Sequence, residues 1–152
     1  MRLCQYMRPL KLRPATPEDA EFLFHLLKAT MREYVDQTWG WDEEWQQAYF
    51  QMRFDPTKNQ IIVLDDQDIG VMSTEKRENE IFLSSIYILP EYQGQGIGTQ
   101  LLKSLVAEAF GEGLPVTLRV LKVNPARRLY ERLGFSVIRE TETRYFMKAK
   151  PG

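Results

Sequence analysis

The chain has 152 residues, the length of one ordinary domain, and we expect residues 1–152 to form a single domain. Its 43% hydrophobic and 27% charged residues are typical of globular proteins and exclude a disordered chain. Twenty Lys and Arg residues against 21 Asp and Glu residues leave a net charge of −1, which provides no general positive field for nucleic acid or an anionic membrane. Cys4 is the only cysteine, which excludes an internal disulfide and a metal site built on cysteines.

The sequence also lacks the marks of a membrane or secreted protein. Residues 1–9 contain no apolar signal region, and nowhere do 18 apolar residues follow one another. We therefore expect a soluble, cytoplasmic protein with neither membrane nor nucleic-acid partners.

The first half of the chain is predicted to form one strand, two helices and a β-hairpin. Thr16 and Pro17 suit the cap and the first position of a helix, which the apolar spacing then continues. In the second helix we assign Phe50, Met52 and Phe54 to the core. The expected elements are a strand at 10–13, helices at 16–36 and 42–54, and strands at 61–64 and 69–75.

The second half alternates strands with helices. Asn124 followed by Pro125 is typical of a helix cap and first turn, and Gly134 ends that helix. The expected elements are strands at 81–89, 116–120, 135–138 and 144–147, and helices at 97–111 and 124–134. Because helices separate only some of the strands, the predicted fold class is α/β (α+β) with a mixed sheet.

The most informative segment is a glycine-rich loop between a predicted strand and a predicted helix. Residues 89–99 read Leu-Pro-Glu-Tyr-Gln-Gly-Gln-Gly-Ile-Gly-Thr, and we call residues 93–99 the glycine loop. Free N–H groups and the helix dipole favour an anion there, and glycines let a phosphate approach the backbone. The loop fits neither the Walker A pattern nor the dinucleotide fingerprint. Alternatively, the glycines only make a tight turn.

Two segments resemble a known family. Gln93-Gly94-Gln95-Gly96-Ile97-Gly98 is similar to the Gln/Arg-x-x-Gly-x-Gly/Ala signature of the GCN5-related N-acetyltransferases (GNAT). Residues 124–135, from Asn124 through Leu129-Tyr130 to Gly134-Phe135, resemble that family's Asn…Ala…Leu-Tyr…Gly-Phe helix. Here Asn124 and Tyr130 are six positions apart, where many members have seven. With the order of elements, the resemblance covers about residues 10–148.

The resemblance implies a mostly antiparallel sheet in which one parallel strand pair splays to bind acetyl-CoA. In this chain those strands would be 81–89 and 116–120, and no metal would be needed. The residues that would hold the cofactor are Ile86 and Ile88 through their backbone, Gln93, Gly94, Gln95, Gly96, Ile97, Gly98 and Thr99 through N–H groups, and Asn124 and Arg127. Asn124 would equally serve as a helix cap, and Arg127 would equally be a solvated surface charge.

Tyr130 is the catalytic residue that the resemblance implies. It would act as the general acid, giving its phenolic proton to the departing CoA thiolate, for which a phenol with an ordinary pKa of about 10 is a reasonable match. Its neighbours Leu129, Leu133 and Phe135 are predicted core residues, so packing is the alternative interpretation.

The sequence does not assign a general base. An alkyl amine with a pKa of about 10.4 is almost wholly protonated at neutral pH. Direct attack of the amine on a thioester therefore needs a general base that removes this proton. Glu75 and Glu80 are candidates, with Ser84 or Ser85 relaying the proton through water. His25 lies in an amphipathic helix, where a structural role is the more frequent one.

The acceptor is expected to meet an aromatic and acidic stretch, residues 34–45. In the family, the segment between the first two helices borders the acceptor, and aromatic rings and carboxylates suit a cationic amine. The alternative is that Trp41 and Trp45 form one buried helical face. The candidate acceptor-binding residues are Tyr34, Asp36, Trp39, Trp41 and Glu75.

The functional prediction is an acetyl-CoA-dependent N-acetyltransferase that acts directly on a primary amine of a small molecule. The alternatives are acetylation of a protein or peptide at an N-terminus or lysine, and a CoA-binding module without turnover. The resemblance also allows a homodimer, with strand 144–147 at its interface.

Overall fold

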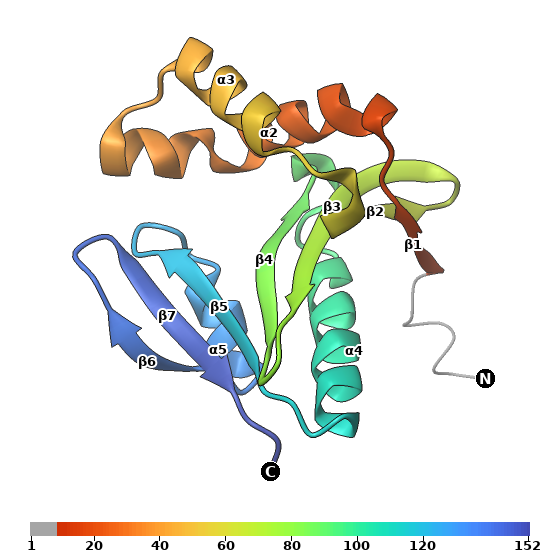
Figure 1. Cartoon of the computed structure of the whole chain (residues 1–152), viewed down its shortest axis with the longest axis vertical. Coiled ribbons are helices and arrows are strands. Elements are labelled where there is room, and N and C mark those ends of the chain that lie inside the picture. Colours follow the sequence, from red (N-terminus) through yellow and green to blue (C-terminus); the bar gives the residue numbers. More distant parts are fainter. Residues whose placement is uncertain (1–8) are drawn as a thin grey trace. The chain divides into compact units, whose positions relative to one another are not determined.

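The structure is a computed structural model that describes residues 9–152 (Figure 1). These residues divide into a first unit, residues 9–73 and 85–97, and a second unit, residues 74–84 and 98–152. In chain order the elements are β1 (Leu10–Pro14), η1 (Pro17–Asp19), α2 (Ala20–Trp39), α3 (Glu43–Arg53), η2 (Pro56–Lys58), β2 (Asn59–Leu64), β3 (Gln67–Lys76), β4 (Ile81–Ile88), η3 (Pro90–Tyr92), α4 (Ile97–Gly111), β5 (Val116–Leu121), α5 (Arg127–Arg132), β6 (Ser136–Glu140) and β7 (Arg144–Ala149).

The strands form a seven-stranded sheet in the order β1-β2-β3-β4-β5-β7-β6. The pairs β1–β2, β2–β3, β5–β7 and β6–β7 are antiparallel, whereas β4 and β5 are parallel. The predicted mixed sheet with one parallel pair is therefore confirmed.

Two predicted helix boundaries differ from the structure. The first long helix continues to Trp39, three residues beyond the expected Asp36, and ends where Gly40 takes a φ of +87°. The last helix begins at Arg127, and its N-cap is Ala126 instead of the expected Asn124. The Asn124 side chain still accepts a hydrogen bond from the N–H of Ala126, at 2.9 Å, so it shapes the turn that leads into the helix.

The first unit is held by a core beneath α2. Its buried members are Ala15, Leu23, Leu26, Ile61 and Val71, and Phe50 and Phe54 of the α3 region pack against them, as predicted. Met52 was expected in this core, but its side chain is 73% exposed, so that prediction is wrong. A residue two positions from each of two core-facing phenylalanines points away from them on a helix, since i and i+4 share a face and i+2 does not.

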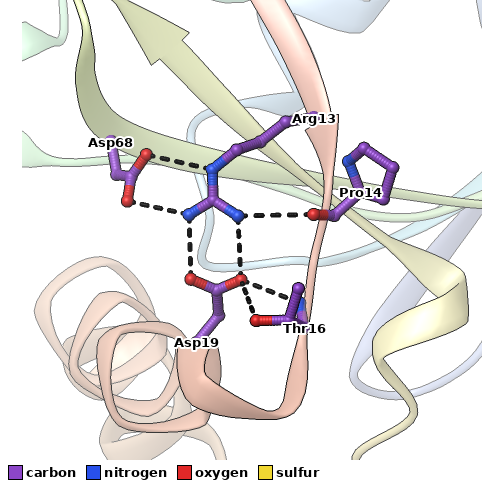
Figure 2. Close-up of polar contacts among 5 residues, drawn as sticks. All are labelled: Arg13, Pro14, Thr16, Asp19 and Asp68. Atoms are coloured by element: carbon purple, nitrogen blue, oxygen red, sulfur yellow. Dashed lines mark hydrogen bonds and ion pairs between the residues drawn. The ribbon is translucent and has the colours of Figure 1, made fainter.

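A guanidinium ties the start of the first unit together (Figure 2). Arg13 donates to both carboxylate oxygens of Asp19, at 2.8 and 3.0 Å, and to those of Asp68, at 2.9 and 3.4 Å. A further bond reaches the Pro14 carbonyl at 3.3 Å, so all five N–H donors are engaged. The backbone N–H of Thr16 also donates to Asp19, at 2.8 Å. These contacts connect β1, η1 and the beginning of β3.

In the second unit, β5 lies between β4 and β7. Val116 and Leu118 of β5 are buried, and so are their partners on β7, Ala149 and Met147. Leu102 of α4 is fully buried as well. This unit carries both strands of the parallel ladder and the whole of α5.

Gly70 of β3 permits a close approach of β4 in the first unit. A Cβ atom there would clash with the Tyr87 carbonyl oxygen and would lie 3.1 Å from Ile62 Cδ1 and 3.2 Å from Ile88 Cα. Backbone atoms cannot move aside as a flexible side chain can, so Gly70→Ala should lower the free energy of unfolding by about 1–3 kcal/mol. Urea denaturation measures this loss.

The matched control for Gly70 is Gly111→Ala at the end of α4, where an added Cβ meets no atom within 4 Å. This change should leave the free energy of unfolding unchanged within about 0.5 kcal/mol or raise it slightly. Equal stability of the two variants would contradict the steric role of Gly70.

Asp19 should make the stability pH-dependent. Hydrogen bonds from Arg13 lower the pKa of this carboxyl to about 2. A depressed folded-state pKa stabilises the protein above the unfolded pKa of about 3.9, and this contribution is lost as the pH falls toward 2. Asp19→Asn should therefore lower the free energy of unfolding by about 2 kcal/mol at pH 7, and by progressively less below about pH 4. Urea denaturation across this pH range measures the difference.

Asp66→Asn is the control for Asp19, because Asp66 is exposed in the β2–β3 turn at a φ of +63°, which asparagine accepts. Its free energy of unfolding should stay within about 0.5 kcal/mol of that of the original chain at both ends of the pH range. A constant deficit of Asp19→Asn at every pH would show that the Arg13–Asp19 contact does not depend on the charge.

Candidate functional site

The glycine loop presents its backbone. Gly94 and Gly96 have φ values of +74° and +81°, and the space where each Cβ would stand is open to at least 4 Å. The side chains of Gln93 and Gln95 donate to carbonyl oxygens of Ile88 and Glu91, at 2.8 and 3.2 Å, so they brace the loop from within. The N–H of Gln93, which was expected to bind phosphate, already donates to the Pro90 carbonyl at 3.2 Å, so that part of the prediction is wrong. What the loop offers to a ligand is therefore its N–H groups from Gly94 onward.

The loop is anchored on both sides. Before it, the Tyr92 hydroxyl of η3 donates to the Gln67 side chain at the start of β3, at 2.9 Å. At its other end, the buried Ile97, within the loop itself, is the first residue of α4, a helix of 15 residues. The first N–H groups of a helix have no acceptor within the helix. The positive end of the helix dipole lies at the same terminus and favours an anion there. The arrangement fits a phosphate or diphosphate group without a metal.

The parallel ladder between β4 and β5 is short. It contains the pairs Ile81↔Val116, Phe82↔Thr117 and Leu83↔Leu118, whereas β4 runs on to Ile88 and β5 to Leu121. From Ser84 onward, the backbone groups of β4 therefore lie outside this ladder. These include the predicted cofactor-binding positions Ile86 and Ile88, both half-buried.

Tyr130 is buried in α5. The residue is only 9% exposed. Its ring contacts the ring of Phe135 edge to face, with the two ring centroids 5.9 Å apart. Its carbonyl accepts the N–H groups of Leu133 and Phe135, which closes the end of the helix. These contacts show that Tyr130 has a packing role, as the alternative interpretation expected.

Arg127 is held against an aromatic ring. Its guanidinium lies 4.3 Å from the centroid of Tyr145, and Nη2 reaches Glu131 at 3.4 Å. Its Nε is buried and has no acceptor in the described part of the chain. The Arg127 side chain as a whole is 39% exposed, so both the cofactor-binding and the surface-charge interpretations stay open for it.

Tyr145 was not singled out from the sequence. Lys122 also lies over its ring, with Nζ 5.2 Å from the centroid, and the same lysine pairs with Glu140 at 2.6 Å. Alternation along β7 was the available signal, because Tyr145 shares the inward face of that strand with the buried Met147 and Ala149.

The predicted acceptor-binding residues fall in both units. Asp36 accepts the backbone N–H of Trp41 at 2.9 Å, and the Trp41 indole donates to Glu43 at 2.9 Å. Lys28 of α2 completes this link to α3 by pairing with Glu43 at 3.0 Å, and together these donors lower the pKa of the Glu43 carboxyl. Asp36 and Trp41 therefore fix the α2–α3 connection.

Two tryptophans of this stretch are on the surface. Trp39 is 55% exposed at the end of α2, and Trp45 is 57% exposed on α3, where it stacks on Tyr49 at 4.9 Å. The alternative of a buried Trp41–Trp45 helical face is therefore wrong. Tyr34 is half-buried on α2, in the first unit with Asp36, Trp39 and Trp41.

The candidate bases occupy the second unit or its boundary. Glu75 accepts from Arg77 at 3.4 Å. Glu80 accepts from Arg77 at 3.1 Å and from the hydroxyl of the buried Thr117 at 2.9 Å. Ser84 is exposed on β4, and Ser85 is half-buried. His25 lies exposed on α2.

Across residues 9–152, no three His, Cys, Asp or Glu side chains gather in a way that could hold a metal ion. Over the same range, no helix combines the length and the apolar character needed to cross a bilayer.

Comparison with known proteins places these features in a family. A model of the acetyltransferase (GNAT) family matches residues 21–135, more than half of the chain. The [ribosomal protein bS18]-alanine N-acetyltransferase of Haemophilus influenzae is 34% identical over 92 residues, which are 60% of this chain and 62% of that protein. The thialysine N-epsilon-acetyltransferase of Bos taurus is 42% identical over 72 residues, 46% of this chain and 42% of that protein. The chain thus matches less than two thirds of the length of these relatives.

Solved structures show the same fold. The PaiA N-acetyltransferase of Thermoplasma acidophilum, solved in complex with coenzyme A, aligns with a TM-score of 0.74 at 20% identity, covering 93% of this chain and 98% of that one. The ribosomal-protein-S18-alanine N-acetyltransferase of Escherichia coli aligns with a TM-score of 0.66 at 20% identity, covering 94% of each.

Proposed function

The chain belongs to the acetyltransferase (GNAT) family, and we propose that it transfers the acetyl group of acetyl-CoA directly to a primary amine of a small molecule. The observation that carries this proposal is the glycine loop, with two left-handed glycines and open space beside each, leading straight into a 15-residue helix. Acetyl-CoA supplies an activated acyl group, a thioester, to which an amine nitrogen can bond.

The cofactor-binding residues are proposed by position. Gly94, Gln95, Gly96, Ile97, Gly98 and Thr99 would hold the diphosphate of CoA through backbone N–H groups, and Gln93 would support the loop through its side chain. Ile86 and Ile88 would bond the pantetheine arm along the part of β4 that lies beyond the β5 ladder. The buried Nε of Arg127 is a donor that lacks an acceptor among the described residues, which supports a role for Arg127 and its neighbour Asn124 in binding the same molecule.

Tyr130 is proposed to donate its phenolic proton to the CoA sulfur as the carbon–sulfur bond breaks. Its packing in α5 supports the proposal, because contact with Phe135 holds the ring, and thus the direction of the phenol, in one place. The amine must lose a proton in the same reaction, and Glu75 and Glu80 stay candidates to receive it, with Ser84 or Ser85 as relays.

The acceptor is proposed to contact Tyr34, Asp36, Trp39, Trp41 and Glu75. The exposed ring of Trp39 supports this assignment, since a cation binds to the face of an indole. Asp36 and Trp41 would act mainly by fixing the end of α2, where Trp39 lies.

A protein or peptide amine is the second candidate. One relative is by name an N-acetyltransferase of a ribosomal protein, and another is one of thialysine, so both acceptor classes occur among the relatives.

We propose a cytoplasmic enzyme, either a monomer or a homodimer. Thiol release from acetyl-CoA, measured against polyamines, amino acids, aminoglycosides and short peptides, decides between the acceptors. If a folded protein that binds CoA released no thiol with any of these amines, the result would support a CoA-binding module without turnover.

Tyr130→Phe tests the general acid. Removing one hydroxyl should lower kcat about 100-fold or more, because a positioned proton donor is lost, and leave the affinity for CoA within a few-fold. Thiol release and calorimetric CoA titration measure the two quantities. Tyr49→Phe on α3 is the matched control, with its ring stacked on Trp45 in the first unit, and it should retain full activity. Unchanged kcat in Tyr130→Phe would remove Tyr130 from the mechanism.

Gly96→Ala tests the glycine loop. A methyl group at a φ of +81° strains the backbone by about 1 kcal/mol and displaces the adjacent N–H groups, so the Kd for CoA should rise about tenfold or more. Gly113→Ala introduces a comparable strain, at a φ of +74°, in the turn after α4. It should lose similar stability but bind CoA normally. An equal loss of CoA affinity in both variants would refute a specific role for the loop.

A further inference from the structure

One face of the sheet in the second unit gathers positive charge, although the whole chain carries a net charge of −1. Residues directly opposite each other on neighbouring strands share a face of the sheet. The registers Thr117↔Lys148, Arg119↔Phe146 and Arg139↔Phe146 thus line up across β5, β7 and β6, which lie side by side (Figure 1). The cations of this surface, which we call the basic face, are Arg77, Arg119, Arg139, Arg144 and Lys148.

Aromatic rings hold three of these guanidinium groups. Arg77 lies 4.2 Å and Arg119 5.8 Å from the centroid of Phe82, on β4 opposite Thr117. Arg139 lies 3.9 Å from the centroid of Phe146. Stacking on a ring restricts an arginine that would otherwise sample many rotamers, so less entropy is lost when it binds a ligand.

Three of these five cations have no carboxylate partner in the described part of the chain. Two carboxylates, Glu75 and Glu80, pair with Arg77. No carboxylate oxygen of residues 9–152 lies within 4.0 Å of a charged nitrogen of Arg119, Arg139 or Lys148. Residues 1–8 contain no Asp or Glu that could pair with them. The basic face therefore keeps a local excess of positive charge.

We propose that the basic face binds an acidic, extended segment of a partner polypeptide. An arginine fork matches a carboxylate with two parallel hydrogen bonds. Arg119 and Arg139 stand on strands separated by β7, so their backbones are about 10 Å apart. In an extended segment of the polyproline II type, carboxylates three residues apart lie on the same side and have about the same spacing, since this conformation has three residues per turn and rises about 3.1 Å per residue. One such segment can therefore engage both arginines.

Charge and geometry favour a polypeptide over a nucleic acid. Proteins that bind single strands offer open aromatic faces for the bases, whereas Phe82 and Phe146 are already stacked against arginines. A chain with a net charge of −1 also lacks the general positive field that a phosphate backbone requires. The proposal goes beyond acetyl transfer, because it concerns a surface that recruits a partner.

The test is the binding of a fluorescein-labelled oligoglutamate peptide, followed by fluorescence anisotropy with neither acetyl-CoA nor amine present. The original chain should bind it, and the double variant Arg119→Glu with Arg139→Glu should raise the Kd tenfold or more. Raising the ionic strength from about 0.05 to about 0.2 M should weaken binding, because the contacts are exposed ion pairs. Oligoglutamine of equal length should not bind.

The matched control is Lys103→Glu with Arg132→Glu, which makes the same change in net charge at exposed positions of α4 and α5. It should leave the Kd within about threefold. Should the first double variant fail to fold by circular dichroism, Arg119→Gln with Arg139→Gln takes its place. Absence of oligoglutamate binding, equal weakening in both double variants, or tighter binding of an oligouridylate would each overturn the proposal. None of these outcomes bears on acetyl transfer, which the thiol-release assay tests separately.

Discussion

The guanidinium of Arg13 is the polar contact that sets how the elements at the start of the first unit are arranged over its apolar core. With two carboxylates and a carbonyl, it uses every donor it has, and it thereby joins β1, the turn that starts α2 and the beginning of β3. Asp68 stands next to Gln67, whose side chain holds Tyr92 just before the glycine loop. The start of β3 thus carries both the carboxylate that pairs with Arg13 and, one residue earlier, the side chain that bonds the residue before the glycine loop. A lysine could not replace Arg13, because an ammonium group has three donors and no planar fork.

Local sequence signals predicted the elements well, and their errors have identifiable causes. The apolar spacing gave α2 and α4, and proline and glycine marked most of the ends. The α2 helix runs past Asp36 because the Thr38 hydroxyl bonds the Tyr34 carbonyl and Gly40 provides the left-handed end. The cap of α5 moved by two residues because the Asn124 side chain bonds Ala126 within a turn. Both depend on side-chain hydrogen bonds that periodicity does not contain.

The candidate site was predictable where backbone conformation decides it. Alternate glycines between a strand and a helix predict an open, N–H-rich loop, and Gly94 and Gly96 have the left-handed conformation that such a loop needs. Side-chain roles were not predictable in the same way. Nothing in the spacing of Asp36 and Trp41 says that one closes a turn onto the other, and nothing near Arg127 says that Tyr145, 18 residues later, lies beneath it. The basic face could not be predicted from the composition, because the total charge is balanced and the cations of this face come from separate strands.

The short β4–β5 ladder also has a consequence for synthesis of the chain. Ile81 and Leu83 of β4 meet partners that come 35 residues later, at Val116 and Leu118. The first unit is complete in sequence at Ile97, so on the ribosome it can assemble while β5 is still missing. During that interval an apolar strand edge at residues 81–83 is uncovered, and such an edge pairs readily with another chain. Speed of elongation through residues 98–121 therefore sets how long the nascent protein is exposed to aggregation.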